Sequence, residues 1–323
     1  MAVTFYKVED NTLIKWQIGS DSHAKVYPLI CDRLTLTSDI PSQHKKSVIE
    51  EMKAMGAKKQ GMYKYSCLIK DVPATLAPYH ADEEAEDKIT SAYIQCAPAS
   101  DDIGFIRLDC NPARINLGIL KEYLATTVLN PNIGFDYLLK YGKVTRIDFA
   151  VDIDSEQVDN LYYYYDKMKY VEIVHTKSGR TEYIGGKTKT GKRIVIYDRT
   201  PAIKAHNYKK AYFPKMQIPV PEQDIMRVEV RLHPNKPFVD LHGLANPFEP
   251  LCISAPKPND NDLAWNLFLP LARFEGAQAS LGRLSKHRKK SYNERLEKSA
   301  VTWWNPNKIW EQYKNLMKSI ENL

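Results

Sequence analysis

Strict alternation of apolar and polar residues predicts an amphipathic strand over residues 144–153. One face is apolar throughout, and the other carries Arg146, Asp148 and Asp152. Two carboxylates and a guanidinium on a half-buried strand are costly to remove from water. The pattern therefore predicts a partner that offsets this cost, either a divalent metal ion or a phosphate group beside a metal.

Two later segments repeat this arrangement of one apolar and one polar face. In residues 192–199, alternation places four side chains on the same side of the strand: Arg193, Val195, Tyr197 and Arg199. Residues 226–232 carry on their polar side Arg227, Glu229 and Arg231. If the three strands lie in one antiparallel sheet, we expect four side chains to converge on one point: Asp148, Asp152, Tyr197 and Glu229.

The remaining pattern predicts an α+β fold. Strand-like stretches cover residues 12–16, 34–37, 62–69, 91–95, 103–110, 172–175 and 181–184. Helical spacing covers residues 42–57, 116–128, 154–169, 263–274, 280–298 and 307–323. Because prolines cluster beyond residue 232, we expect a catalytic domain over residues 1–235 and a proline-rich linker with a helical region over residues 236–323. The predicted architecture is a central, mainly antiparallel sheet with flanking helices and a helical C-terminal extension.

Composition favours a globular protein for which a polyanionic partner is plausible. The 323 residues include 46 Lys and Arg against 39 Asp and Glu, for a formal net charge of +7. The five cysteines show no C-x-x-C spacing, which argues against a disulfide framework and a zinc site and favours a cytoplasmic location. No segment has the length and apolarity of a signal peptide or a membrane span, so no membrane partner is expected.

Carboxylates are the expected metal ligands. None of the eight histidines forms a His-x-His pair, so Asp148, Asp152 and Glu229 would have to hold the ion. Oxygen ligands of this kind suit Mg²⁺ or Mn²⁺. The alternative is that these three carboxylates form ion pairs with Arg146, Arg227 and Arg231.

Tyr197 is the candidate nucleophile, although a tyrosine in the middle of a strand is more often a packing residue. A phenol has a pKa near ~10 and attacks phosphorus when cations lower that pKa or a base removes its proton. Arg193, Arg199 and Arg227 are expected to supply the positive charge. The rival is Tyr163, within the run of four tyrosines at residues 162–165.

Basic residues form two candidate DNA contacts. The loop at residues 186–192 nearly spells a phosphate-binding P-loop, but Arg193 stands where Ser or Thr is needed and a strand follows, so ATP is not expected. The candidates near the site are Arg146, Lys187, Lys189, Lys192 and Arg231. A second cluster, which could equally be a solvated helix face, contains Lys286, Arg288, Lys289 and Lys290.

Four motifs in order carry a resemblance to a known family. They are Thr145-Arg-Ile-Asp-Phe-Ala-Val-Asp152, Glu182-Tyr-Ile-Gly185, Arg193-Ile-Val-Ile-Tyr-Asp-Arg199 and Arg227-Val-Glu-Val-Arg231. Together they resemble the replication initiation factors of rolling-circle plasmids and filamentous phages, the Rep_trans type. The resemblance covers about residues 30–235 and implies a sheet like that of the HUH endonucleases or a related one.

The resemblance implies a metal-dependent enzyme in a bacterial host that nicks one strand at a replication origin, in a single-stranded or cruciform region. A tyrosine, here mapped onto Tyr197, would stay joined to the 5′ phosphate and free a 3′ hydroxyl for the host polymerase, with a host helicase as a further partner. By analogy, a homodimer suits a protein that nicks twice. Two other functions stay open: a non-catalytic DNA-binding protein, and a metal nuclease that uses water as its nucleophile.

Overall fold

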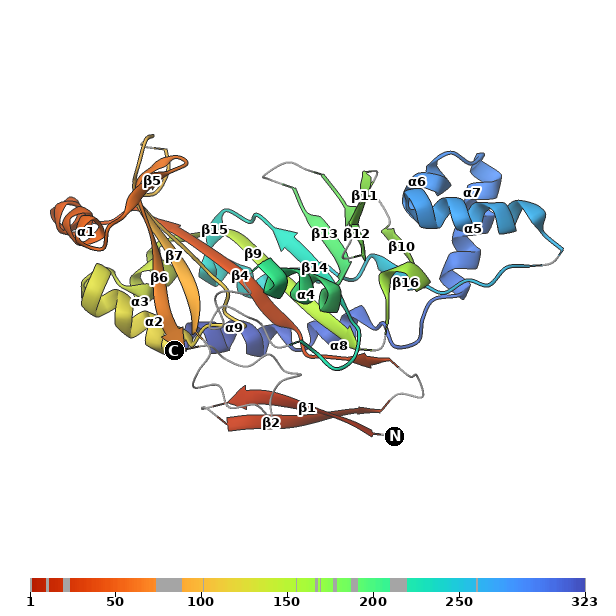
Figure 1. The fold of residues 1–323 in the computed structure, drawn as a ribbon, viewed down its shortest axis with the longest axis horizontal. Helices are drawn as coiled ribbons and strands as arrows, with labels where there is room; N and C mark the ends of the chain where they lie inside the picture. The colour runs from red at the N-terminus through yellow and green to blue at the C-terminus, as the bar shows by residue number, and fades with distance from the viewer. Residues whose placement is uncertain are drawn as a thin grey trace.

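The computed structural model describes residues 2–9, 12–19, 24–73, 89–100, 102–154, 156–165, 168, 170–176, 179–186, 191–209, 220–259 and 261–322. Within these residues the fold is α+β and is built on one large antiparallel sheet (Figure 1). This confirms the predicted class and the predominance of antiparallel pairing. The finer likeness to HUH endonucleases stays a prediction.

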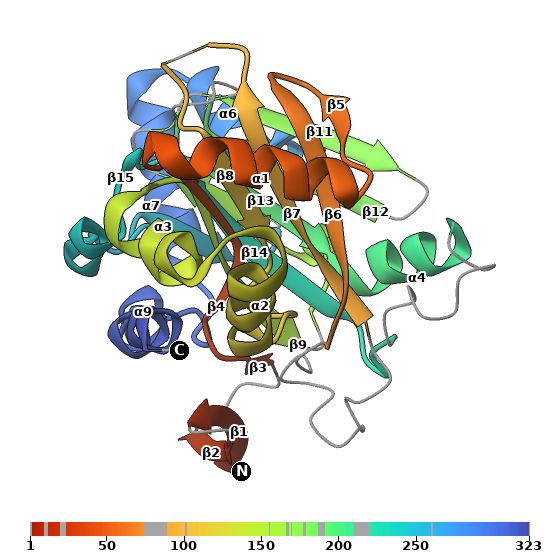
Figure 2. The same cartoon turned by 90° about the vertical axis from the view of Figure 1, so that its left-hand side faces the viewer.

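The large sheet has twelve strands, ten of which follow one another in the order β11-β12-β13-β14-β9-β4-β8-β7-β6-β5, while β3 and β15 pair with β9. Its strands are β3 (Lys25–Val26), β4 (Ile30–Ser38), β5 (Lys58–Gln60), β6 (Tyr63–Pro73), β7 (Ile89–Pro98), β8 (Ile106–Cys110), β9 (Lys143–Asp154), β11 (Val171–Thr176), β12 (Gly179–Ile184), β13 (Arg193–Asp198), β14 (Ile225–Leu232) and β15 (Lys236–Pro237). The sheet twists along its length, so β6 and β7 are turned relative to β9 and β14 (Figures 1 and 2).

Two small antiparallel pairs and a set of helices complete the described fold. The pairs are β1 (Ala2–Glu9) with β2 (Thr12–Gly19), and β10 (Tyr162–Tyr165) with β16 (Leu251–Ser254). The α-helices are α1 (Ser42–Ala54), α2 (Leu117–Tyr123), α3 (Phe135–Tyr141), α4 (Arg199–Lys209), α5 (Leu263–Glu275), α6 (Ala277–Gly282), α7 (Lys286–Lys298), α8 (Pro306–Trp310) and α9 (Tyr313–Glu321). Shorter turns are the π-helical η2 (Leu124–Val128) and the 3₁₀ segments η3 (Pro131–Ile133), η4 (Val158–Asn160) and η6 (Phe238–Gly243).

The C-terminal helices α8 and α9 pack against the apolar face of the sheet. Phe149 of β9 meets Trp310 and Tyr313 edge to face, with ring centroids 5.5 Å apart in both pairs. These helices belong to the same core as the sheet, whereas α5, α6 and α7 form a smaller cluster with Tyr162 and Tyr164. The region after residue 235 therefore contributes to both clusters, with α8 and α9 in the core of the sheet and α5–α7 in the smaller one. The domain boundary at residue 235 stays a prediction.

Three sequence expectations were wrong about local structure. Residues 154–169 were expected to be helical, but their described part contains η4 and β10, because β10 gains a strand partner, β16, almost ninety residues further on. The helix expected over 280–298 breaks after Gly282 into α6 and α7. Arg199, expected on the strand of Tyr197, instead begins α4, and Pro201 in the first turn suits a helix start.

Candidate functional site

The strand register brings the three predicted motif strands together. β13, β14 and β9 are neighbours in the sheet, and Tyr197 lies opposite Arg227, which in turn lies opposite Asp152. Further along the same strands, Arg231 lies opposite Asp148. The expectation that these strands form one antiparallel sheet is confirmed.

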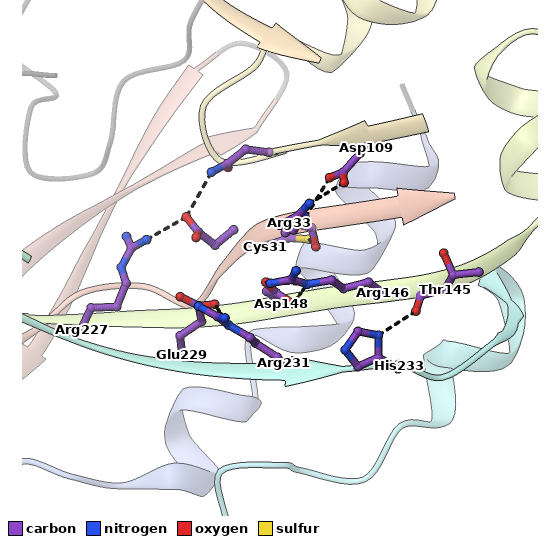
Figure 3. Close-up of polar contacts among 12 residues, drawn as sticks. Cys31, Arg33, Asp109, Thr145, Arg146, Asp148, Arg227, Glu229, Arg231 and His233 are labelled. Atoms are coloured by element: carbon purple, nitrogen blue, oxygen red, sulfur yellow. Dashed lines mark hydrogen bonds and ion pairs between the residues drawn. The ribbon is translucent and has the colours of Figure 1, made fainter. Parts of the chain in front are cut away.

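A polar cavity of about 1590 Å³ lies over this face and continues across β4, β8, β7 and β6. The lining residues on which the argument rests are Asp32, Arg33, Asp148, Tyr197, Glu229 and Arg231. The opposite faces of β9, β13 and β14 are apolar and buried, so alternation along each strand directs its polar side chains to this one side. Figure 3 shows Arg227, Glu229 and Arg231 projecting from β14 beside Arg146 and Asp148 of β9.

Arg227 is the centre of a buried ion-pair network next to the cavity. Its side chain is 1% exposed. Its Nε and Nη2 donate to the two carboxylate oxygens of Asp152 at 2.6 and 2.7 Å, and its Nη1 donates to Oδ1 of Asp32 at 2.7 Å. Arg199 adds a second cation, with Nε 3.8 Å from Oδ2 of Asp152. A forked guanidinium bound in this way is held in one orientation.

This network sets the ionisation of its two carboxylates. Burial opposes the charged form of Asp152, but Arg227 and then Arg199 outweigh it and hold the pKa below its usual value. Asp32 follows the same balance: burial raises its pKa, and Arg227 leads the cations that lower it to about 2. Both groups are therefore anionic at neutral pH, and Asp32 is a site residue that the sequence analysis missed.

The other two predicted metal ligands also bind arginines. Asp148 accepts hydrogen bonds from Nε of Arg146 at 2.9 and 3.1 Å, and Oε1 of Glu229 accepts one from Nε of Arg231 at 2.6 Å (Figure 3). Both pairs join positions i and i+2 of one strand. Both carboxylate oxygens of Asp152 accept hydrogen bonds from Arg227. Each of the three expected metal ligands is therefore paired with an arginine, which was the alternative to metal binding.

The described residues do not fit a preformed metal site. Within them, no group of three or more His, Cys, Asp or Glu side chains is arranged to hold a metal ion. A Mg²⁺ or Mn²⁺ ion would have to displace an arginine from a carboxylate, and a buried carboxylate already bound by a guanidinium is a poor ligand. The ion expected from the sequence stays a prediction.

Tyr197 lines the cavity, but its phenol is not activated by its surroundings. Burial is the largest influence and raises the pKa to about 12, against the cations of Arg227 and Arg199. Arg227 and Arg199 lower this pKa as expected, but burial and the charges of Glu229 and Asp32 outweigh them, so the pKa of Tyr197 lies above its usual value. Attack by this oxygen would therefore need a group that takes its proton.

The pKa of Glu229 is raised. Burial of its side chain is the main cause, Arg231 opposes it, and the nearby charges of Asp32 and Asp148 reinforce it. Glu229 lies opposite Val195, two residues before Tyr197 on β13, both Glu229 and Tyr197 line the cavity, and the charge of Glu229 raises the pKa of Tyr197. A carboxylate with a raised pKa is a better proton acceptor than an ordinary one.

A second polar network, which the sequence analysis missed, covers the far part of the cavity. Asp109 of β8 binds Nε of Arg33 at 2.9 Å and Nη2 of Arg107 at 2.7 Å. The amide of Gln95 then donates to Oγ of Ser66 at 2.9 Å. The signal for it was again the i, i+2 spacing of an arginine and a carboxylate on one strand, here Arg107 and Asp109.

The cavity has no excess of positive charge. Among its lining residues, five are basic, namely Arg33, Arg107, Lys143, Arg146 and Arg231. Six are acidic, namely Asp32, Asp39, Asp102, Asp109, Asp148 and Glu229. The formal net charge of the lining is therefore −1, and the cavity as a whole does not attract a phosphate group. A phosphate would have to replace a carboxylate as the partner of an individual arginine side chain.

The remaining candidates lie away from Tyr197 or outside the described residues. Arg193 lines no part of the cavity: its Nη2 binds Oε2 of Glu172 at 3.0 Å, and its guanidinium lies 4.1 Å from the ring centre of Tyr183. Lys192 points to the other face of β13 and contacts the hydroxyl of Tyr165, and burial lowers its pKa to about 8. Lys187 and Lys189 fall outside the described residues.

Tyr163 does not reach the cavity. It is fully buried, with its hydroxyl 3.3 Å from the carbonyl oxygen of Val158 and 3.1 Å from Sδ of Met226, on the apolar side of β14. Burial raises its pKa well above the usual value. The arrangement therefore opposes Tyr163 as the alternative nucleophile.

The second basic cluster lies in the α5–α7 lobe. The candidate residues there are Lys286, Arg288, Lys289 and Lys290, all exposed at the start of α7. In Figure 1 this lobe stands at the end of the molecule beside β10 and β11. These cations therefore form a surface patch outside the cavity.

Across the described residues, no helix has both the length and the apolarity to cross a membrane. No family model, curated protein or solved structure matches the chain.

Proposed function

We propose that the chain nicks and rejoins one DNA strand at a rolling-circle replication origin, with Tyr197 as the nucleophile. The observation that carries the proposal is the place of Tyr197 on a cavity wall directly opposite the buried Arg227. A tyrosine beside fixed guanidinium groups, within reach of a carboxylate of raised pKa, has the components of phosphodiester transesterification. The four motif segments that resemble the Rep_trans initiators supply the case for an origin as substrate.

In the proposed reaction the phenolic oxygen of Tyr197 attacks the scissile phosphorus as its proton passes to Glu229. The bond from phosphorus to the 3′ oxygen breaks, and that oxygen takes a proton from solvent water and leaves as a hydroxyl. Arg227 and Arg199 are buried behind the cavity wall, and their positive charge would stabilise the charge of the pentavalent transition state without direct contact. The 5′ phosphate stays on Tyr197, and attack by a 3′ hydroxyl reverses the sequence, so the circle closes without ATP.

The raised pKa of Tyr197 makes Glu229 necessary to this scheme. At neutral pH almost no phenolate is present when the pKa is about 12, so proton transfer must accompany attack. Binding of the phosphate by arginine forks would at the same time release carboxylates such as Asp148 from their present partners.

The test is formation of a covalent protein–DNA adduct. The whole chain is incubated with supercoiled origin DNA and Mg²⁺ or Mn²⁺, and labelled DNA joined to protein is detected after denaturing electrophoresis. We expect the adduct to be lost in Tyr197→Phe and kept in Tyr163→Phe and in Tyr141→Phe, a matched change elsewhere on the cavity wall. An adduct that survives in Tyr197→Phe would reject the assignment.

A second function is favoured by the pairing of every expected metal ligand with an arginine. A non-catalytic DNA-binding protein needs neither a metal site nor an activated phenol, and such paired charges would serve it as a rigid polar surface. It predicts a shift of DNA mobility without covalent attachment and without any requirement for a divalent ion. A nuclease that uses water predicts cleavage with no adduct.

A further inference from the structure

Helix α5 has a second apolar face that its own fold leaves uncovered. Toward the lobe, it buries Trp265, Phe268, Leu269 and Ala272 against α6, α7 and the tyrosines of β10. On its outer side stand Leu263, Leu267, Leu271 and Phe274, which are 73%, 63%, 42% and 72% exposed. We call these four residues the α5 stripe. A single exposed leucine needs no explanation, but four large apolar side chains on one helix face mark an interaction site.

The stripe has the shape of a helix-packing ridge. Its members are spaced by four, four and three residues, and at 100° per residue they span an arc of only about 80°. Ridges of side chains four residues apart fit the grooves of a second helix. A stripe of this narrow width is typical of the seam between two packed helices, and the opposite side of α5 is already occupied by the lobe.

Two ion pairs align α7 alongside α5 and so fix where the charge lies. Near the start of α5, Arg295 of α7 binds Asp262 at 2.7 Å. At the end of α5, Arg283, which precedes α7, binds Glu275 at 2.6 Å. The exposed basic cluster at the start of α7 therefore lies toward the Phe274 end of the α5 stripe.

The lobe that carries the stripe is strongly basic. Residues 263–298 contain eight Lys and Arg against three Asp and Glu, a formal net charge of +5 out of +7 for the whole chain. A second copy of this chain would set two such lobes against each other, with mutual repulsion. Acidic side chains flanking an apolar ridge would instead complement it and speed association.

We propose that the α5 stripe is a docking site for an acidic amphipathic helix of another protein. The partner would place its own apolar ridge over Leu267 and Leu271 and its acidic residues beside Lys289 and Lys290. His175 of the edge strand β11 stacks on Phe274, with ring centres 6.2 Å apart, so the docking site adjoins the large sheet. The proposal is independent of the nicking reaction and assigns a role to the helical lobe.

The binding test uses the whole chain and three synthetic probes. The first is a fluorescein-labelled helical peptide with leucines spaced four, four and three residues apart and glutamates beside them. The second has lysines in place of the glutamates, and the third contains the residues of the first in scrambled order. Fluorescence anisotropy measures binding at low and high salt. We expect saturable binding of the first peptide alone, weakened as salt rises.

Variants of the chain locate the binding surface. Leu267→Glu is expected to weaken binding at least about tenfold, because burial of one leucine supplies that much affinity. Val239→Glu is the matched control, since Val239 is 64% exposed, as Leu267 is 63%, but lies on η6. The double variant Lys289→Glu with Lys290→Glu should weaken the acidic peptide only, and Lys46→Glu on α1 should leave binding unchanged. Circular dichroism and thermal unfolding establish that each variant is folded.

Three outcomes would overturn the proposal. A concentration-dependent dimer, seen by light scattering and lost in Leu267→Glu but not in Val239→Glu, would assign the α5 stripe to a second copy. Binding to phosphatidylserine vesicles with no binding to the acidic peptide would assign it to a lipid surface. Equal binding of all three peptides, or of none, would show that the stripe docks no acidic helix.

Discussion

Tyr197 and Arg227 lie directly opposite each other on the paired strands β13 and β14. Arg227 is in turn fixed from behind by Asp152 and Asp32 through three hydrogen bonds of 2.6–2.7 Å. A cation so firmly positioned beside a cavity-lining phenol is suited to stabilise charge that develops there, because no reorganisation is needed as the charge forms. The same hydrogen bonds also make Arg227 important for the stability of the fold.

Arg227→Met is expected to destabilise the fold by about 3–5 kcal/mol, because it leaves Asp152 buried without a partner. Lys46→Met is the comparison, since Lys46 and its partner Glu50 are both exposed on α1, and about 1 kcal/mol or less is expected. Urea unfolding at pH 7 measures both. Equal losses in the two variants would contradict the central place given to Arg227.

Stability should fall in acid as Asp32 takes up a proton. Its folded-state pKa of about 2 lies below the usual 3.8, so its contribution is fully present above pH 3.8 and is lost as pH falls toward 2. The pKa difference corresponds to about 2 kcal/mol. Urea unfolding between pH 6 and 2 should show a shallower fall in Asp32→Asn than in the parent. Parallel curves would mean that Arg227 does not depress this pKa.

Glu229→Gln tests the proton acceptor of the proposed reaction. Glutamine keeps the size and an oxygen for Arg231 but cannot accept the proton of Tyr197, so the rate of adduct formation should drop about 100-fold or more. Binding of the same DNA, measured by mobility shift, should change little. Asp109→Asn, a carboxylate change in the far part of the cavity, is the control and should keep most of the rate. Unchanged adduct formation in Glu229→Gln would remove Glu229 from the mechanism.

The arginine pairs predict weak binding of divalent ions in the absence of DNA. The parent chain should bind Mn²⁺ with a Kd no tighter than about 1 mM, a free energy near −4 kcal/mol. Arg146→Ala frees Asp148 and should tighten binding, which the electron paramagnetic resonance of free Mn²⁺ would measure. A micromolar site in the parent chain would instead support the preformed ligand set expected from the sequence.

The sequence was sufficient to predict strands β9, β13 and β14 and the face of each strand that carries the polar side chains. Strict alternation decided both, since a period of two leaves one choice of face once the apolar side is buried. We also predicted that the strands of Asp152, Arg227 and Tyr197 lie in one sheet, and the strand register confirms it.

The partners of the carboxylates were harder to predict. Arg146 with Asp148 and Glu229 with Arg231 are i, i+2 pairs on single strands, a spacing that suits an ion pair as well as a metal ligand set. Asp32 joins Arg227 from almost two hundred residues away, through the pairing of β4 with β9. Tyr163 was predicted to lie on a helix for the same reason, because β10 is stabilised as a strand by its pairing with the distant β16.

The most direct test of the central claim is to find the atom that carries the DNA. The parent chain is allowed to react with origin DNA, the adduct is digested with nuclease and protease, and the modified peptide is sequenced by mass spectrometry. We predict a nucleotide 5′-linked through phosphate to the phenolic oxygen of Tyr197. Attachment to any other residue, or no attachment under conditions in which the DNA is cut, would contradict the account.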